Sequence, residues 1–303
     1  MKKSAGEIHH HIRRTGEDWA VDITVHFLAV IILIACFYPF YLAIVLAFNE
    51  GKDAALGGIF FWPRKFTLEN FTHLLEDPIW GKALLITLSR TVIGTVITTL
   101  FTAMVAYGLS DRTLVFRKIY MTMIIIAMYF SGGIIPYFAI LRSLRLINNF
   151  LVYIIPGMLN LFYVLVSISF FQGIPNELGE SARIDGAGEM KIFYKIILPV
   201  SLPLLATIAI FTAVGHWNSW FDAAFFTQNK DLRTMGYQLM AIINKSNTAM
   251  SANVQPEALA AMQTTTMSVQ VAAMLVAVLP ILVVYPFFQR YFISGLTLGS
   301  VKS

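Results

Sequence analysis

The chain has 303 residues, of which 57% are hydrophobic and only 13% are charged. Soluble domains are roughly a quarter charged, and the mean hydropathy of +0.69 is likewise too apolar for a water-soluble fold. The formal net charge of +5 comes from scattered basic residues, without the stripe or recognition motif of a nucleic-acid-binding protein. Composition therefore excludes both of these classes and indicates an integral membrane protein.

Six apolar runs are long enough to cross a bilayer, which takes about 20 residues of helix. In lipid the backbone must satisfy its own hydrogen bonds, so each run is predicted to be helical. The predicted spans are Ile23–Phe48, Ala83–Gly108, Ile119–Leu141, Leu151–Gln172, Val200–Phe221 and Val269–Phe288. The expected fold is an all-α integral membrane protein with one six-helix domain over residues 23–288, a leading segment 1–22 and a tail 289–303.

The first part of the chain carries few chemical signals. Acidic residues in the leading segment do not fit the head of a cleaved signal peptide. The single cysteine, Cys36, lies within the first span, so an intrachain disulfide is excluded. Residues 60–66 combine aromatic and basic side chains, which is typical of a segment at the membrane interface.

The second predicted span is rich in small and hydroxyl-bearing residues. Its threonines and Gly94 permit close approach of neighbouring helices and hydrogen bonds between them. The span also holds Arg90, whose guanidinium needs either a buried partner or a route to water. Because Arg90 lies early in the span, snorkelling towards the outer surface is the favoured interpretation. Asp222, after the fifth span, is expected to mark the outer membrane boundary, since a carboxylate in hydrocarbon is costly.

The third predicted span is interrupted at Ser131, Gly132, Gly133 and Pro136. A broken helix of this kind lines the pathway in some transporters. Proline and glycine are also common in ordinary membrane helices. The sequence predicts the break and leaves both interpretations open.

The segment between the fourth and fifth spans, residues 174–199, has the most informative pattern. Leu178, Ala182 and Asp185 recur at helical spacing, Gly186 then ends the helix, and Pro199 permits a new start. The pattern predicts a short amphipathic helix lying against the membrane. Such a helix either docks into the groove of a partner or lies solvated at the interface, and the pattern alone does not separate the two.

The same segment resembles the cytoplasmic loop of permease subunits in binding-protein-dependent ABC importers. That family pattern is E-A-A, three residues, G, nine residues, then I-x-L-P. The matching positions, with serine as the one departure, are Glu180, Ser181, Ala182, Gly186, Ile196, Leu198 and Pro199. Other stretches resemble the carbohydrate branch of this family, that of the maltose-type inner permease. Within that branch the chain is most similar to the permeases for polysaccharide, aldouronate and alginate oligosaccharides. The stretches are residues 67–71, 182–188, 217–218, 289–292 and 295–299.

The resemblance implies the fold of a type I importer permease, with a coupling helix between the fourth and fifth spans. It implies a multi-pass protein of the bacterial cell membrane with both termini in the cytoplasm. The implied partners are a second homologous permease, two ATPase subunits and an extracellular solute-binding protein, beside membrane lipid and an oligosaccharide substrate. The residues that it implies for coupling to the ATPases are Glu180, Ser181, Ala182, Asp185, Gly186, Ala187, Ile196, Leu198 and Pro199.

Such a permease is no enzyme and binds no cofactor or metal, since ATP and Mg²⁺ would lie on the partner ATPases. In agreement, the chain has no phosphate-binding G-x-x-x-x-G-K-[ST] run. The run at residues 9–11 is three histidines, but no second ligand cluster accompanies it, so no metal site is predicted.

An oligosaccharide pathway is expected to combine aromatic faces with hydrogen-bonding side chains at membrane depth. The candidates are Tyr137, Asn160, Tyr163, Trp217, Asn218 and Trp220. Trp and Tyr also gather at membrane interfaces irrespective of function. The outer segment 222–268 is polar and long enough to reach a binding protein docked outside.

Two other classes fit the sequence less well. A secondary transporter driven by an ion gradient needs ionisable groups at mid-membrane, and the predicted spans offer only Arg90. An intramembrane enzyme needs a catalytic constellation at membrane depth, but His26 and His216 have no visible partner in the sequence.

Overall fold

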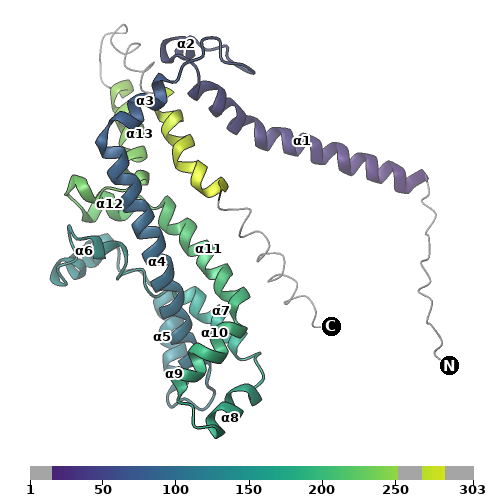
Figure 1. Cartoon of the computed structure of the whole chain (residues 1–303), viewed down its shortest axis with the longest axis vertical. Coiled ribbons are helices and arrows are strands. Elements are labelled where there is room, and N and C mark those ends of the chain that lie inside the picture. The colour runs from purple at the N-terminus through teal and green to yellow at the C-terminus, as the bar shows by residue number, and fades with distance from the viewer. Residues whose placement is uncertain (1–15, 252–267, 284–303) are drawn as a thin grey trace.

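The computed structural model describes residues 16–251 and 268–283, and these form helices and turns without a strand. Figure 1 shows an elongated bundle in which α4 (Pro78–Ser110) runs most of the length and packs against α7 (Leu161–Phe171) and α11 (Leu202–Asn218). One end of the bundle carries α8 (Glu177–Ile184), and the opposite end carries α3 (Glu69–Glu76) and α13 (Met235–Ser251). We refer to these as the α8 end and the α13 end.

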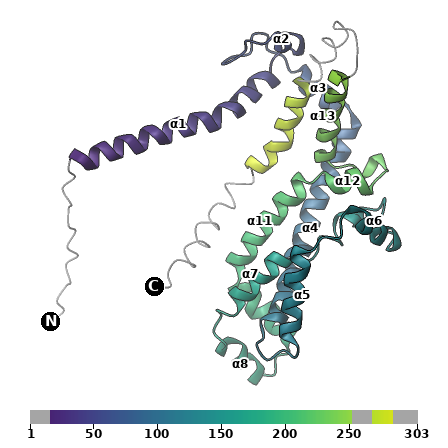
Figure 2. The ribbon, with the colours of Figure 1, turned by 180° about the vertical axis from the view of Figure 1, so that it is seen from behind.

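Helix α1 (Gly16–Ala47) leaves the bundle as a long arm near the α13 end, as Figures 1 and 2 both show. Of its most apolar stretch of 18 residues, only 6% is buried within the chain. The helix starts at Gly16 instead of the expected Ile23. Its attachment to the rest of the chain lies at its end, where Asn70 donates to the carbonyl oxygens of Ala47 and Asn49 at 2.8 and 2.9 Å.

The segment after α1 contains α2 (Gly51–Ala55) and an exposed aromatic loop. Arg64 fixes this loop, because its guanidinium donates to the Asp53 carboxylate at 3.1 Å and to the Gly57 carbonyl oxygen at 2.8 Å. Phe61 and Trp62 are 66% and 77% exposed, as expected for the aromatic stretch at residues 60–66.

Helix α4 begins at an N-cap, since the Asp77 carboxylate accepts from the Ile79 backbone N–H at 2.9 Å, and Pro78 occupies the first turn. The expected interhelical bonds are present. Thr98 donates to the Gly157 carbonyl oxygen at 2.9 Å, and the Thr87 hydroxyl accepts from the Met235 N–H at 2.9 Å. The small and hydroxyl-bearing face of this helix is therefore the centre of the bundle.

Arg90 does not snorkel. It is 3% exposed, and its guanidinium pairs with the Asp222 carboxylate, whose side chain is 23% exposed. The guanidinium also reaches Nδ1 of His216 at 3.4 Å. Snorkelling was the wrong interpretation because a counter-ion distant in sequence folds against α4, and His216 does have a polar neighbour.

The third predicted span is broken as expected. Helices α5 (Arg117–Tyr129) and α6 (Ile134–Ser143) are bent by 117° across residues 130–133. Gly133 has a φ of +81°, a conformation that favours glycine. The fourth predicted span is also not one helix, because only η1 (Phe150–Tyr153) and α7 are helical, with an irregular link at residues 154–160.

Helix α8 is followed by α9 (Glu189–Ile192), a π-helical turn η2 (Phe193–Ile197) and α10 (Leu198–Val200). These three together bend by 82° into α11. The described part of the predicted outer segment 222–268 contains helices. These are α12 (Phe221–Phe226), which begins one residue before the segment, η3 (Lys230–Leu232) and α13.

Within the described residues, α1 and α4 are each long and apolar enough to cross a membrane. The two bent pairs, α5 with α6 and α9–α10 with α11, are candidates if each pair is one span. Two shorter apolar helices are Leu161–Phe171 and Ser268–Val283. The tail at residues 289–303 lies outside the described residues, and the number of six spans stays a prediction.

Candidate functional site

Helix α8 is the predicted amphipathic helix, and its C-terminus is tightly closed. The Ala187 N–H donates to the Ala182 carbonyl oxygen at 2.9 Å, and the Gly186 N–H donates to that of Arg183 at 3.0 Å. This pair of bonds is the Schellman motif, which requires a left-handed residue after the helix. Gly186 supplies it with a φ of +77°. Local sequence thus ends the helix where the glycine predicted it.

A hydrogen-bonded strut joins α8 to the end of α4. Arg183 of α8 donates from Nε to Oε1 of Glu189 at 2.7 Å, and the Tyr107 hydroxyl of α4 donates to Oε2 of Glu189 at 2.7 Å. The bond to Arg183 lowers the pKa of the Glu189 carboxyl, and the bond to Tyr107 adds to this effect. The pKa of Arg183 is raised by the same contact. We call Tyr107, Arg183 and Glu189 the α4–α8 strut.

The outward face of α8 lacks a cover within the described chain. Leu178 and Ile184 are 41% and 87% exposed, and Glu180, Ser181 and Asp185 are exposed beside them. A polar cavity of about 570 Å³ lies between α8 and the end of α4, with Glu180 and the α4–α8 strut in its lining. Exposed apolar side chains beside charged ones are typical of an interaction site.

The remaining residues of the predicted coupling loop lie on the inner side of α8. Ala182, Ala187, Ile196 and Leu198 pack against one apolar cluster, which includes Phe193 and the end of α7. Pro199 lies in the first turn of α10. The loop therefore has an exposed side with charged groups and a packed side that reaches the bundle.

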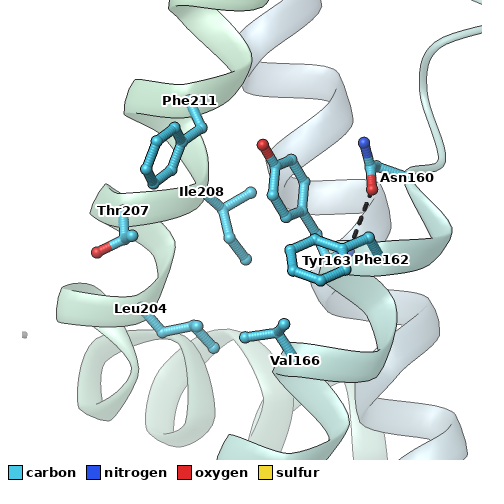
Figure 3. A pocket seen from close by; sticks show the side chains of 8 residues that line it. All are labelled: Asn160, Phe162, Tyr163, Val166, Leu204, Thr207, Ile208 and Phe211. Carbon is cyan, nitrogen blue, oxygen red and sulfur yellow. Dashed lines mark hydrogen bonds between the residues drawn. The ribbon is translucent and has the colours of Figure 1, made fainter.

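A second site is a groove between α7 and α11, of about 380 Å³. Figure 3 shows side chains of both helices facing it, with the ring of Tyr163 between the two helices. The Asn160 side-chain oxygen accepts from the Tyr163 N–H at 3.1 Å and so caps α7. The lining is completed by Phe162, Val166, Leu204, Thr207, Ile208 and Phe211.

Two of the six predicted pathway residues, Asn160 and Tyr163, line this groove. The others lie elsewhere. Trp217 is buried and donates from Nε1 to the Ala277 carbonyl oxygen at 2.8 Å, while Asn218 is exposed at the end of α11. Trp220 packs against the neighbouring Phe221 ring at 6.0 Å, and Tyr137 packs edge-on against Phe226 at 5.4 Å.

Sequence reasoning missed several residues of both sites. Tyr107 is 82 residues from Glu189, and no local pattern links them. Thr207 and Phe211 lie in an apolar run that reads as uniform membrane helix. Asn160 directly before an apolar run was a usable signal, because asparagine is a favoured N-cap residue.

Comparison with known proteins decides the family. The family model for the binding-protein-dependent transport system inner membrane component matches residues 27–297. The chain belongs to this family. This permease is 34% identical to the polygalacturonan/rhamnogalacturonan transport system permease protein YtcP of Bacillus subtilis, over 93% of this chain and 98% of that protein. It is 28% identical to the arabinooligosaccharides transport system permease protein AraQ of Halalkalibacterium halodurans, over 94% and 96% of the two chains.

The fold of the permease matches a solved structure. A chain in the crystal structure of a bacterial ABC transporter involved in the import of the acidic polysaccharide alginate superposes with a TM-score of 0.81 and 26% identity, covering 92% of this chain and 99% of that chain. The expected family and transport function are thereby confirmed, and the fold is that of this family's permeases.

Proposed function

We propose that this permease imports oligosaccharides from an extracellular binding protein, driven by ATP hydrolysis on two partner subunits that grip α8. The observation that carries the proposal is α8 itself. Its apolar side chains are exposed, its end is closed by Gly186, and the α4–α8 strut ties it to the longest helix of the bundle. A helix held in this way transmits a push from a docked partner to α4.

Docking of α8 into the ATPases places the α8 end in the cytoplasm. Glu180 then pairs with a basic group of the ATPase, and Ala182 and Gly186 permit close approach. The permease spans a bacterial cell membrane, and both of its termini lie in the cytoplasm as well. A second homologous permease completes the pathway. ATP and Mg²⁺ stay on the ATPases, and the permease catalyses no reaction.

The substrate follows from the groove between α7 and α11. Aromatic rings of Phe162, Tyr163 and Phe211 offer faces for sugar rings to stack on, and Asn160 and Thr207 offer hydrogen bonds. Relatives named for the transport of polygalacturonan/rhamnogalacturonan and of arabinooligosaccharides support a short polysaccharide fragment as the transported substrate.

The test is uptake of labelled oligosaccharides into vesicles that contain the full complex. We expect uptake to need ATP and the binding protein, and to vanish in Gly186→Leu while ATP hydrolysis continues. Uptake driven by an ion gradient without ATP would contradict the proposal.

The groove has its own test. Tyr163→Ala removes the central ring and is expected to lower uptake about tenfold, the effect of losing one aromatic contact of roughly 1.5 kcal/mol. Tyr163→Phe keeps the ring and serves as the matched control. Equal uptake by the alanine variant and wild type would place the pathway elsewhere.

A further inference from the structure

Coupling through α8 does not use the polar cluster centred on Arg90 of α4. The guanidinium is 3% exposed and donates from Nη2 to the Asp222 carboxylate of α12. It also donates to the Ser219 carbonyl oxygen and to Nδ1 of His216, both at 3.4 Å. These three partners lie consecutively at the end of α11, in the link after it and in the first turn of α12.

The cluster extends to η1. The Arg90 Cζ atom lies 4.7 Å from the centre of the Tyr153 ring, a distance at which a cation is attracted to the ring face. The Tyr153 hydroxyl donates to the Leu232 carbonyl oxygen at 2.6 Å. Arg90 thus holds η1 and the α11–α12 link together against α4.

Close packing sets the geometry of the cluster. A Cβ atom on Gly94 would lie 2.5 Å from Nε2 of His216, so only glycine lets this ring lie on α4. Residues 219–220 alone connect α11 to α12. Any movement of α12 away from α4 therefore separates Asp222 from Arg90.

The two ions are unequally shielded. The Arg90 side chain is 4% exposed and that of Asp222 is 23% exposed, so the carboxylate can move towards water while the guanidinium stays enclosed. A buried ion pair is a poor source of stability, since a well-packed apolar pair often serves as well. Losing one partner is costly, however, because the other charge is left uncompensated.

We propose that Arg90 and Asp222 form a latch that holds the α11–α12 link against α4 and releases it when the binding protein docks. The latch lies nearer the α13 end than the α8 end, so it controls the side of the pathway that receives substrate. This inference rests on the proposed function, which assigns that side to the outside. With the latch open, the permease mimics the docked state and activates the ATPases without the binding protein.

The decisive variant replaces the ion pair by an apolar one, Arg90→Met with Asp222→Leu, in the full complex in lipid. We expect ATP hydrolysis without the binding protein to rise at least about fivefold, a common size for coupling between two sites, and its stimulation by the binding protein to fall. Asp222→Asn, which keeps the shape of the side chain, is expected to act in the same direction.

The matched control is a second ion pair between α4 and the segment after α12. Lys82 and Asp231 lie 2.6 Å apart, with side chains 61% and 63% exposed. The double variant Lys82→Gln with Asp231→Asn removes this pair and is expected to leave both rates unchanged.

An independent readout uses Ala223, which is fully buried next to Asp222. In a Cys36→Ser background, Ala223→Cys is expected to react slowly with a water-soluble maleimide and about fivefold faster when Asp222→Asn is added. This comparison needs no ATPase activity, so it also tests the latch if the apolar double variant does not assemble.

The outcomes separate the two proposals. Wild-type rates and slow labelling in the latch variants would overturn the latch and leave the importer function standing. If the binding protein did not stimulate ATP hydrolysis by the wild-type complex, the proposed function would be overturned. The labelling rate of Ala223→Cys would then be the test of the latch.

Discussion

Within this chain, Gly186 is needed at the end of α8 for its backbone conformation. Its φ is +77°, and a Cβ atom added there would meet nothing within 4 Å in the chain. Residues with a Cβ atom adopt this region at a cost of roughly 1–2 kcal/mol, and asparagine tolerates it best. The end of α8, and hence its direction, depends on this single residue.

Substitution of Gly186 separates the backbone role from the docking role. Gly186→Ala is expected to lower the ratio of transport to ATP hydrolysis, because the Schellman motif loosens. Gly186→Asn keeps the left-handed backbone but adds a side chain on the exposed side, where we propose that the ATPase docks. If asparagine restores coupling in the uptake assay, the backbone is what matters, and if it fails as alanine does, close approach by the ATPase is the reason for glycine.

Glu189 gives α8 a pH dependence whose sign is fixed by its lowered pKa. The ion pair with Arg183 stabilises the fold fully above the ordinary glutamate pKa of 4.5 and is lost as pH falls through the lower folded value. Because both side chains are about half exposed, the effect is at most about 1 kcal/mol. The difference in thermal unfolding between wild type and Glu189→Gln should therefore be largest at pH 7 and shrink as pH falls below the ordinary glutamate pKa, whereas a constant difference would contradict the assignment.

At the scale of elements, the close approach of α11 to α4 at His216 depends on Gly94. Gly94→Ala places a methyl group against His216 and is expected to destabilise the bundle by about 1–3 kcal/mol. Gly108→Ala in the same helix meets nothing within 4 Å, so it is expected to be neutral or stabilising by about 0.5–1 kcal/mol. Melting temperatures in detergent test this pair, and equal shifts would contradict the role of Gly94.

Elements were predictable from sequence where the cause is local. The break between α5 and α6 and the end of α8 follow from glycines that act on their own backbone. The irregular link before α7 was missed, because its apolar composition does not distinguish it from a membrane helix. For the segment after Asp222 the sequence predicted only a polar outer position, and its polar composition did not indicate α12 or α13. Tyr107 and Glu189 were missed for a different reason, since their contact joins segments 82 residues apart.

At the scale of the whole molecule, α4 connects the α4–α8 strut with the Arg90 cluster. Its last turn holds Tyr107 in the α4–α8 strut, and Arg90 lies in its first half. We propose that α4 carries a displacement of α8 towards Arg90, because one continuous helix connects the two places. The family and the general transport function were predictable from the loop pattern, whereas the partners of Tyr107 and Arg90 were not.

The sequence distance within the Arg90 cluster also affects how the protein is made. Asp222 follows Arg90 by 132 residues. During synthesis, the helix that carries Arg90 therefore enters the membrane well before Asp222 has been translated. A lone arginine at the centre of a membrane helix costs about 2.5–3.5 kcal/mol on insertion scales, a cost that the apolar residues of α4 must offset. Until α11 and α12 emerge, the nascent chain carries an unpaired charge. Variants with a less apolar α4 are therefore expected to insert poorly into the membrane during synthesis, which would lower the amount of permease and not its transport rate.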